Sequence, residues 1–545
     1  MMSNRLQTLI CTAFFKTFDY DTSHSSCGAH YGQLSWALSA YPPPDIPPQV
    51  DYHLSATTGA NMTPTSSQLE HLIQKHAKPI GRLTDTYKLP LHVLFLEQFE
   101  ANARGFADAL SRSYPKGFVA LAVKSNPCRG AVRAASLRGL GIDAASENEM
   151  LLGLEEGIAP ERIICNGNAK SDAYLAGALE AGCLIAVDNQ DEIDEIERLT
   201  ADGVRQASIL LRFRGMPLSG LTSDDQTTAA DWTKFGFHIR EASHLFSQFV
   251  DHSTIRCRGV SAHIGTQIAE PSGYERLLDH LLVLMEQAQQ CGLSPDLIDV
   301  GGGFPVSFLT EKAWREFQAR LRERLLSKAS GSVTWNDLPM GYSNGASAGA
   351  SWIGKAYWSA VPQAAMLDHL LHHTFADGRT CTQRLHDLGS PSLIIEPGRA
   401  LMATAGITLA QVAGTKTVLD HTVVSLDMGI NNHGTNLISP DMFPAAVLPL
   451  REDDAPIEAF LAGRLCFSGD MISKTKVTLN RLPQRGERFV LFHTGAYSAD
   501  HFASNSCGFL RPAKVAIRAN GQAELWRAPE TFSTVFGKAD DPLVA

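Results

Sequence analysis

The sequence predicts an α/β protein: a TIM-like (β/α)8 barrel followed by a C-terminal β-rich domain. Between about residues 90 and 310, short apolar runs alternate with amphipathic segments through short connections. Such alternation implies parallel strands, and roughly eight units imply closure into a barrel. After about residue 400 the chain changes to β-branched runs and turns, such as 422–426 and 488–492, which predict a separate set of strands.

The predicted elements follow one another without long gaps. A run at 91–95 opens the alternation, and a strand near 80–97 is also expected to join the β-rich domain. Helices are predicted at 99–110, 129–138, 147–156, 171–181, 190–199 and 272–291. Strands are predicted at 118–124, 141–143, 163–165, 184–187, 209–213, 259–263 and 297–300.

The domain boundaries come from changes in composition. Residues 1–65 are rich in Ser, Thr, Pro and Tyr and predict a poorly ordered extension, with Met62 as an alternative start. The barrel is assigned to 90–400, with an insertion around 305–390. Residues 66–89 and 401–545 are assigned to the β-rich domain.

Composition narrows the class of partner. The 545 residues carry a net charge of -10 without a basic block, which argues against nucleic acid and anionic membranes and favours small molecules. No apolar run reaches the roughly 18 residues that span a bilayer, and the N-terminal apolar patch is too polar for a secretory signal. The ten cysteines show no CxxC pair and no metal-ligand spacing. We therefore expect reduced thiols, no metal site and a cytoplasmic location.

Polar residues stand at or just beyond the predicted strand ends, where barrel enzymes carry their active sites. These residues are Lys124, Asp143, Asn166, Asp188, His263 and Gly301. Lys124 ends an apolar run, and burial would lower its pKa toward the neutral amine that Schiff-base chemistry requires. The alternative is a strand-end lysine that reaches solvent.

Three further patterns suit a flat, phosphorylated cofactor. The glycines at 301–303 follow a strand and could offer free N–H groups to a phosphate, although a plain turn has the same pattern. Arg399 could bind that phosphate and Glu396 a protonated ring nitrogen, unless the two form a surface ion pair. His263 could stack on the ring, or could be a satisfied core histidine.

The blocks AVKSNP, HIGTQI, DVGGGF, EPGRAL, LCFSGD and GAYSADHFASNSCGF, in this order between about residues 80 and 520, resemble the fold-type III pyridoxal-phosphate decarboxylases. This is the ornithine/diaminopimelate/arginine decarboxylase family, and residues 163–171 and 234–237 are similar to its diaminopimelate branch. The resemblance implies an alanine-racemase-like barrel with pyridoxal 5'-phosphate. It also implies amino-acid decarboxylation through an external aldimine, loss of carbon dioxide and reprotonation at Cα.

The resemblance also implies roles for individual residues. Lys124 would bind the cofactor as the internal aldimine, His263 would stack on its ring and Glu396 would pair with the ring nitrogen. The other cofactor positions would be Asp143, Glu149, Thr266, Gly301, Gly302, Gly303, Arg399 and Tyr497. Cys466 would donate the proton to Cα. Cys466 and Asp470 would enter from the partner subunit of a head-to-tail homodimer with shared active sites.

The chain departs from the family at positions that contact substrate. Phe467 replaces the acidic residue that usually follows the cysteine, and Ser439 replaces an arginine that binds a substrate carboxylate. Ser506 and Cys507 replace a late aromatic and an asparagine. These changes predict a basic or otherwise modified amino acid as substrate, and not meso-diaminopimelate.

Three alternatives stay open. The chain could be a diaminopimelate decarboxylase proper. It could be an amino-acid racemase of the same fold type, although racemases usually place an arginine on the ring nitrogen where Glu396 stands here. It could also be a non-catalytic binding protein, although such relatives tend to lose the cofactor residues.

Overall fold

A computed structural model describes residues 67–218, 228–307, 358–434, 443–451 and 455–537, with isolated residues between 311 and 347. The expected extension at 1–65, Met62, Ser439 and a large part of the inserted interval, within 308–357, lie outside the described residues. Among the described helices, none combines the length and the apolar character that crossing a membrane requires.

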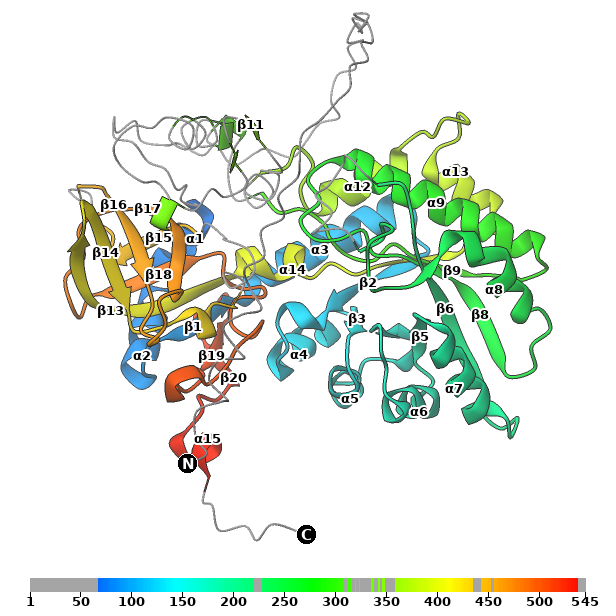
Figure 1. Cartoon of the computed structure of the whole chain (residues 1–545), viewed down its shortest axis with the longest axis horizontal. Coiled ribbons are helices and arrows are strands. Elements are labelled where there is room, and N and C mark those ends of the chain that lie inside the picture. Colours follow the sequence, from blue (N-terminus) through cyan, green and yellow to red (C-terminus); the bar gives the residue numbers. More distant parts are fainter. Residues whose placement is uncertain are drawn as a thin grey trace, which may run out of the picture. The chain divides into compact units, whose positions relative to one another are not determined.

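Eight parallel strands form a closed barrel, as the sequence predicted (Figure 1). The barrel closes because its last strand pairs with its first, with Leu393 opposite Gly117, and because the fourth pairs with the fifth. The strands are β2 (Gly117–Ala122), β3 (Gly141–Ala144), β4 (Ile163–Cys165), β5 (Leu184–Val187), β6 (Ala207–Arg214), β8 (Ile255–Ser261), β9 (Leu297–Asp299) and β12 (Ser392–Ile395). A short strand β7 (Phe237–His238) extends the pairing of β6.

Helices surround the barrel strands (Figure 1). They are α3 (Leu96–Ser113), α4 (Arg129–Leu137), α5 (Glu147–Glu155), α6 (Asp172–Ala181), α7 (Gln190–Thr200), α8 (Ala242–Gln248), α9 (Pro271–Gln290), α12 (Ala364–His372), α13 (Cys381–Asp387) and α14 (Arg399–Met402). Helix α9 shows why they pack: Leu277, Leu281, Leu284 and Ala288 recur every three or four residues and are buried.

A small apolar cluster fills the barrel interior. The cluster is contributed by strands β2, β4, β5, β6, β9 and β12, and contains Ala120, Ile164, Leu184, Ala186, Leu210, Leu297 and Ile394. Because successive strand residues point to opposite faces, the intervening residues pack outward against the helices. Apolar side chains therefore fill the middle of the barrel, and the polar residues gather at the carboxyl ends of the strands.

The β-rich domain contains a nine-stranded sheet. Its strands are β1 (Leu91–Phe95), β13 (Gly406–Val418), β14 (His421–Leu426), β15 (Ala445–Leu448), β16 (Ile457–Ala462), β17 (Met471–Leu479), β18 (Arg488–Phe492), β19 (Lys514–Ile517) and β20 (Ala523–Arg527). Outside it lie the short pair β10 (Tyr342–Ser343) and β11 (Ala346–Ser347), and helix α15 (Phe532–Phe536).

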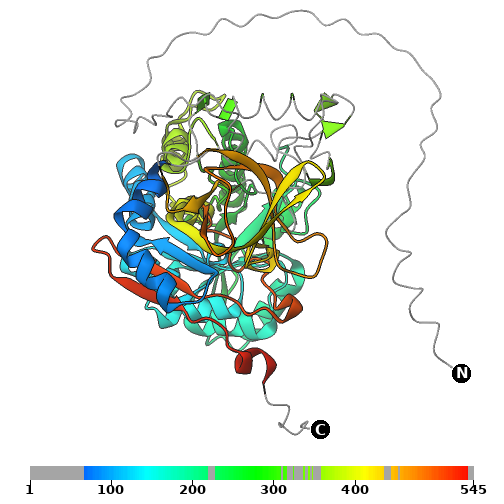
Figure 2. The same ribbon diagram turned by 90° about the vertical axis from the view of Figure 1, so that its left-hand side faces the viewer.

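The structure corrects one expected boundary. The run 91–95 is strand β1, which pairs with β13 and β19. It therefore lies in the sheet of the β-rich domain, where the sequence predicted a strand near 80–97. The barrel segment consequently starts after this strand and not at residue 90. Residues before it form helices α1 (Ser67–Lys75) and α2 (Ala77–Thr86), which pack on the same sheet (Figure 2).

A buried polar network ties the barrel to the β-rich domain directly beside Lys124. The amine of Lys514, on β19, is fully buried and donates to Asn126 Oδ1 at 2.5 Å. It also pairs with Asp500, which in turn pairs with Arg527. Asn126 Nδ2 donates to the carbonyl of Gly495 at 2.9 Å. The segment that carries Lys124 is thus held by strand β19 and by the backbone at Gly495, both of the other domain.

Candidate functional site

Lys124 lies at the carboxyl end of β2, in a short 3₁₀ turn over Val123–Ser125. Its amine pairs with the fully buried carboxylate of Asp143, at the end of the neighbouring strand β3. Burial lowers the pKa of Lys124, but the negative charges of Asp143 and Glu396 outweigh it, and the net pKa is raised. The expectation of a lowered pKa is therefore wrong, because it considered burial without the acids on neighbouring strands.

Asn166 connects two buried carboxyl groups. From the end of β4, its Nδ2 donates to Asp143 Oδ1 and to Glu396 Oε1, each at 2.8 Å. Burial, followed by the charges of Asp143 and Asp299, raises the pKa of Glu396 well above its ordinary value. Burial also raises the pKa of Asp299 to about 6. This concentration of acids favours binding of a further cation.

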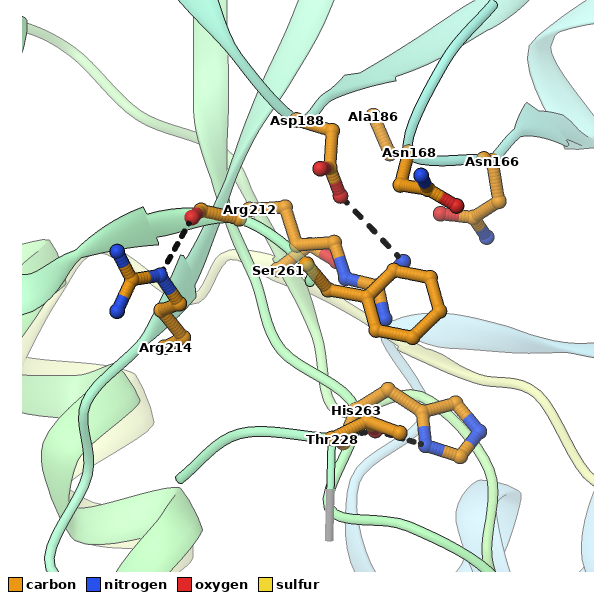
Figure 3. A network of polar contacts seen from close by, with 12 residues as sticks. Asn166, Asn168, Ala186, Asp188, Arg212, Arg214, Thr228, Ser261 and His263 are labelled. Carbon is orange, nitrogen blue, oxygen red and sulfur yellow. Dashed lines mark hydrogen bonds and ion pairs between the residues drawn. The ribbon is translucent and has the colours of Figure 1, made fainter. Parts of the chain in front are cut away.

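His263 lies just beyond β8 and is half-buried (Figure 3). Its Nδ1 accepts the N–H of Gly265 at 3.0 Å and lies 3.2 Å from Thr228 Oγ1. Burial, with the positive charges of Lys124 and Arg212, lowers its pKa to about 3. The ring is therefore neutral at physiological pH, with its proton on Nε2.

The loop at 301–303 has the backbone that only glycine allows. Gly301 and Gly303 have φ values of +69° and +89°. A Cβ on Gly302 would lie 2.4 Å from the carbonyl oxygen of Glu396. Among the described residues, the N–H groups of Gly302 and Gly303 have no hydrogen-bond partner. The loop can therefore donate to an anion, and its predicted contact with a phosphate stays a prediction.

Arg399 and Tyr497 lie together beside this loop. The guanidinium carbon of Arg399 is 5.0 Å from the Tyr497 ring centre, and its buried Nε has no hydrogen-bond partner within the described part of the chain. Tyr497 adopts a φ of +61°, and its N–H donates to the carbonyl of Ser125 at 2.7 Å. A buried, unsatisfied cationic donor beside a phenol suits a phosphate.

Glu149 lies in the first turn of α5, near Asp143. Its Oε2 accepts the N–H of Ala145 at 2.7 Å. Burial raises its pKa from the ordinary 4.5 to about 7, and the charge of Asp143 adds to the effect. Thr266 follows the His263 segment with an exposed side chain. Its predicted contact with phosphate stays a prediction.

We expect Glu149→Gln to reduce the pH dependence of folding stability. A carboxyl with a raised pKa binds its proton more tightly in the folded than in the unfolded state, so stability falls as pH rises from about 4.5 toward 7. In thermal unfolding of cofactor-free protein, the variant should match the wild type at pH 5 and exceed its midpoint at pH 8. Glu155→Gln, on the same helix with a 61% exposed side chain, is the control. Equal midpoints of wild type and Glu149→Gln at pH 8 would contradict this assignment.

One charged residue of the site was not predicted. Arg212, on β6, is buried, and its guanidinium lies 3.8 Å from Asp188 (Figure 3). The guanidinium carbon also lies 4.3 Å from the centre of the Phe235 ring. It contributes positive charge near His263 and Glu396. A charge within the apolar run 209–213 was the signal in the sequence, because such a residue needs a buried partner.

The turn after β16 carries the remaining predicted residues. Cys466 is exposed, and Phe467 is 58% exposed with its ring over Gly469. Asp470 is buried, and its two oxygens accept the N–H groups of Ile430 at 2.7 Å and Leu465 at 2.6 Å. Within its own subunit Asp470 therefore holds the Cys466 loop in place. Its predicted contact with substrate across a dimer stays a prediction.

Comparison with known proteins gives a consistent result. The family model for the pyridoxal binding domain of pyridoxal-dependent decarboxylases matches residues 96–334. A diaminopimelate decarboxylase of Synechocystis is 26% identical over 464 residues, which cover 83% of this chain and 87% of that protein. An uncharacterized protein of Sinorhizobium fredii, y4yA, is 25% identical over 82% of this chain and 91% of its own length.

Solved structures show the same fold. A diaminopimelate decarboxylase of M. jannaschii in complex with L-lysine superposes with a TM-score of 0.67 at 20% identity, covering 85% of this chain and 94% of that one. A lysine/ornithine decarboxylase of Vibrio vulnificus bound to cadaverine gives a TM-score of 0.59 at 21% identity, covering 83% and 100%.

Proposed function

Because this chain belongs to the fold-type III pyridoxal-phosphate-dependent decarboxylases, in their diaminopimelate branch, and is an amino-acid decarboxylase, we propose that its substrate is an amino acid other than meso-diaminopimelate. The catalytic part of this proposal depends on one observation, which is that four groups meet at one end of the barrel. Lys124, His263, the glycine loop and Glu396 come from four different barrel strands and meet at their carboxyl ends.

The residues present fit pyridoxal phosphate, the cofactor of the family. The free N–H groups of Gly302 and Gly303 and the unsatisfied Nε of Arg399 supply donors for its phosphate. Glu396 would hold the protonated ring nitrogen, which is the further cation that the buried acids favour. The neutral, flat ring of His263 would lie against the cofactor ring.

The bound cofactor supplies a sink for the electron pair left when carbon dioxide departs. The amine of Lys124 would hold the cofactor. Asn166 keeps Glu396 and Asp143 in fixed positions through its two hydrogen bonds. The N–H of Tyr497 donates to the carbonyl of Ser125, and Asn126 donates to that of Gly495; the two bonds anchor the turn that carries Lys124.

We propose that Cys466 donates the proton to Cα and that it does so in the active site of a second copy of the chain. The thiol is exposed at the tip of a turn whose base is held by Asp470. The neighbouring Phe467 exposes 58% of its surface, so both side chains are available to a partner subunit. This arrangement supports a homodimer with shared active sites.

The substrate proposal depends on Phe467 and Ser439. At the first position an exposed phenyl ring stands where the branch usually has an acid, so no carboxylate is available there to pair with a distant substrate amine. Ser439 removes the arginine that would bind a distant carboxylate. Both changes disfavour a substrate with charged groups at each end.

The cysteines support a reducing, cytoplasmic location as part of this proposal. The eight that the structure describes are free thiols, and five of them are buried. Buried free cysteines in neighbouring elements are typical of proteins from reducing compartments.

A substrate screen tests the proposed function. Enzyme loaded with pyridoxal phosphate is incubated with single amino acids, including meso-diaminopimelate, L-lysine, L-ornithine and L-arginine, and released carbon dioxide is measured. We expect release from at least one amino acid to exceed that from diaminopimelate. Fastest release from diaminopimelate would contradict the substrate proposal. Formation of the D-amino acid without carbon dioxide would indicate the racemase alternative.

A further inference from the structure

We propose that Glu275, His369 and His373 bind a divalent transition-metal ion, with zinc as the best match, on the outside of the barrel. These side chains are separate from the site around Lys124. One carboxylate oxygen and one ring nitrogen from each histidine all lie within 4.8 Å of one another. The inference is independent of the substrate and of the cofactor.

The geometry brings two imidazoles to one carboxylate. His369 is in α12, and His373 caps the end of this helix four residues later, so both lie on one face. Glu275 is in the long helix α9, which packs beside α12. His369 Nε2 lies 2.8 Å, and His373 Nδ1 3.3 Å, from the same Glu275 Oε1.

The negative charge of Glu275 favours binding of a cation between the three side chains. Among the described residues, Glu275 forms ion pairs with these two histidines and with no lysine or arginine. Zinc takes imidazole nitrogen and carboxylate oxygen at about 2.0–2.2 Å, and tetrahedral angles then place two ligands of one ion roughly 3.4 Å apart. The distances of 2.8 and 3.3 Å from the two histidines to Glu275 Oε1 are within a small side-chain rotation of that spacing.

The surroundings fix the ligands and leave access for the ion. The edge of the His373 ring packs on Phe375, with ring centres 4.9 Å apart, and the carbonyl of His373 accepts the N–H of Cys381 at 2.9 Å. The side chains of His369, His373 and Glu275 are 38%, 24% and 23% exposed. The ion could therefore enter from solvent and keep a water as its fourth ligand.

Bound zinc would link α9 to α12 and stabilise the folded protein by mass action. The test uses the full-length holoenzyme, treated with a chelator, loaded with zinc chloride and desalted before elemental analysis. We expect the wild type to retain one zinc ion per chain more than His369→Ala, His373→Ala or Glu275→Gln. Zinc should raise the thermal midpoint of the wild type by at least about 2 °C, and leave that of the variants unchanged.

His372→Ala is the matched control. This histidine is on the same helix but 64% exposed, and its ring nitrogen contacts Asp368 instead. It should retain the zinc of the wild type. Equal zinc contents in wild type and His369→Ala would overturn the proposal. A second measurement needs no variant: wild type loaded with Co²⁺ should show the visible absorption of nitrogen-bound cobalt, and its absence would also overturn the site.

Discussion

Lys124→Ala is expected to reduce carbon dioxide release by roughly 10⁴-fold, the scale of loss when a residue that forms a covalent bond in catalysis is removed. Lys124 is the amine at the centre of the site, paired with Asp143 and within the field of Glu396. Alanine removes the amine that would attach the cofactor. The measurement is carbon dioxide release with the best substrate of the screen.

Lys116→Ala is the control, because Lys116 is exposed just before the opposite end of the same strand. It should keep the activity of the wild type. The visible absorbance of protein-bound pyridoxal phosphate should disappear in Lys124→Ala and persist in Lys116→Ala. A Lys124→Ala enzyme within tenfold of wild-type activity would contradict the assigned role.

Asp500→Asn is expected to destabilise the protein by about 3–5 kcal/mol, because it leaves a buried ammonium without its charged partner. Lys514 is fully buried, and Asp500 pairs with both Lys514 and Arg527. Burial raises the pKa of Asp500, but the two cations outweigh it and leave the pKa below its ordinary value. The carboxylate is therefore charged at neutral pH. The free energy of unfolding in denaturant is the measurement, at pH 7.

Two variants make this result specific. Lys514→Met added to Asp500→Asn removes the unpaired charge and should recover part of the lost stability. Glu524→Gln breaks the exposed pair with Arg518 in the same domain and should cost less than about 1 kcal/mol. A loss for Asp500→Asn no larger than that for Glu524→Gln would show that the network contributes little.

Much of the barrel could be predicted because its signals are local. Helix α7 was predicted at 190–199 and is observed at Gln190–Thr200, and α5 was predicted at 147–156 and is observed at Glu147–Glu155. The side chains of Asn189 and Ser146 cap these helices by accepting backbone N–H groups. Such caps and the 3.6-residue period are written in neighbouring residues.

The errors concern partners that are distant in sequence. The run 91–95 reads equally well as a barrel strand or as a central strand of another sheet, and its partner Leu409 lies in a far part of the chain. The pKa of Lys124 depends on Asp143 and Glu396, which come from other strands. No local pattern specifies these contacts.

The sequence predicted several residues of the candidate site, but not the hydrogen bonds and ion pairs between them. Lys124, His263, Glu396 and the glycine loop were all placed at strand ends, because apolar runs end where barrel sites begin. The bridging hydrogen bonds of Asn166 and the ion pair of Arg212 with Asp188 were not predicted. Both depend on which strands become neighbours when the barrel closes.

Chemical trapping of the cofactor tests most directly whether Lys124 is the lysine that binds pyridoxal phosphate. Holoenzyme is reduced with borohydride, digested, and its peptides are analysed by mass spectrometry. We expect the pyridoxyl phosphate mass on the peptide that carries Lys124. Modification of a different lysine, such as the buried Lys170 or Lys514, with Lys124 unmodified, would contradict it.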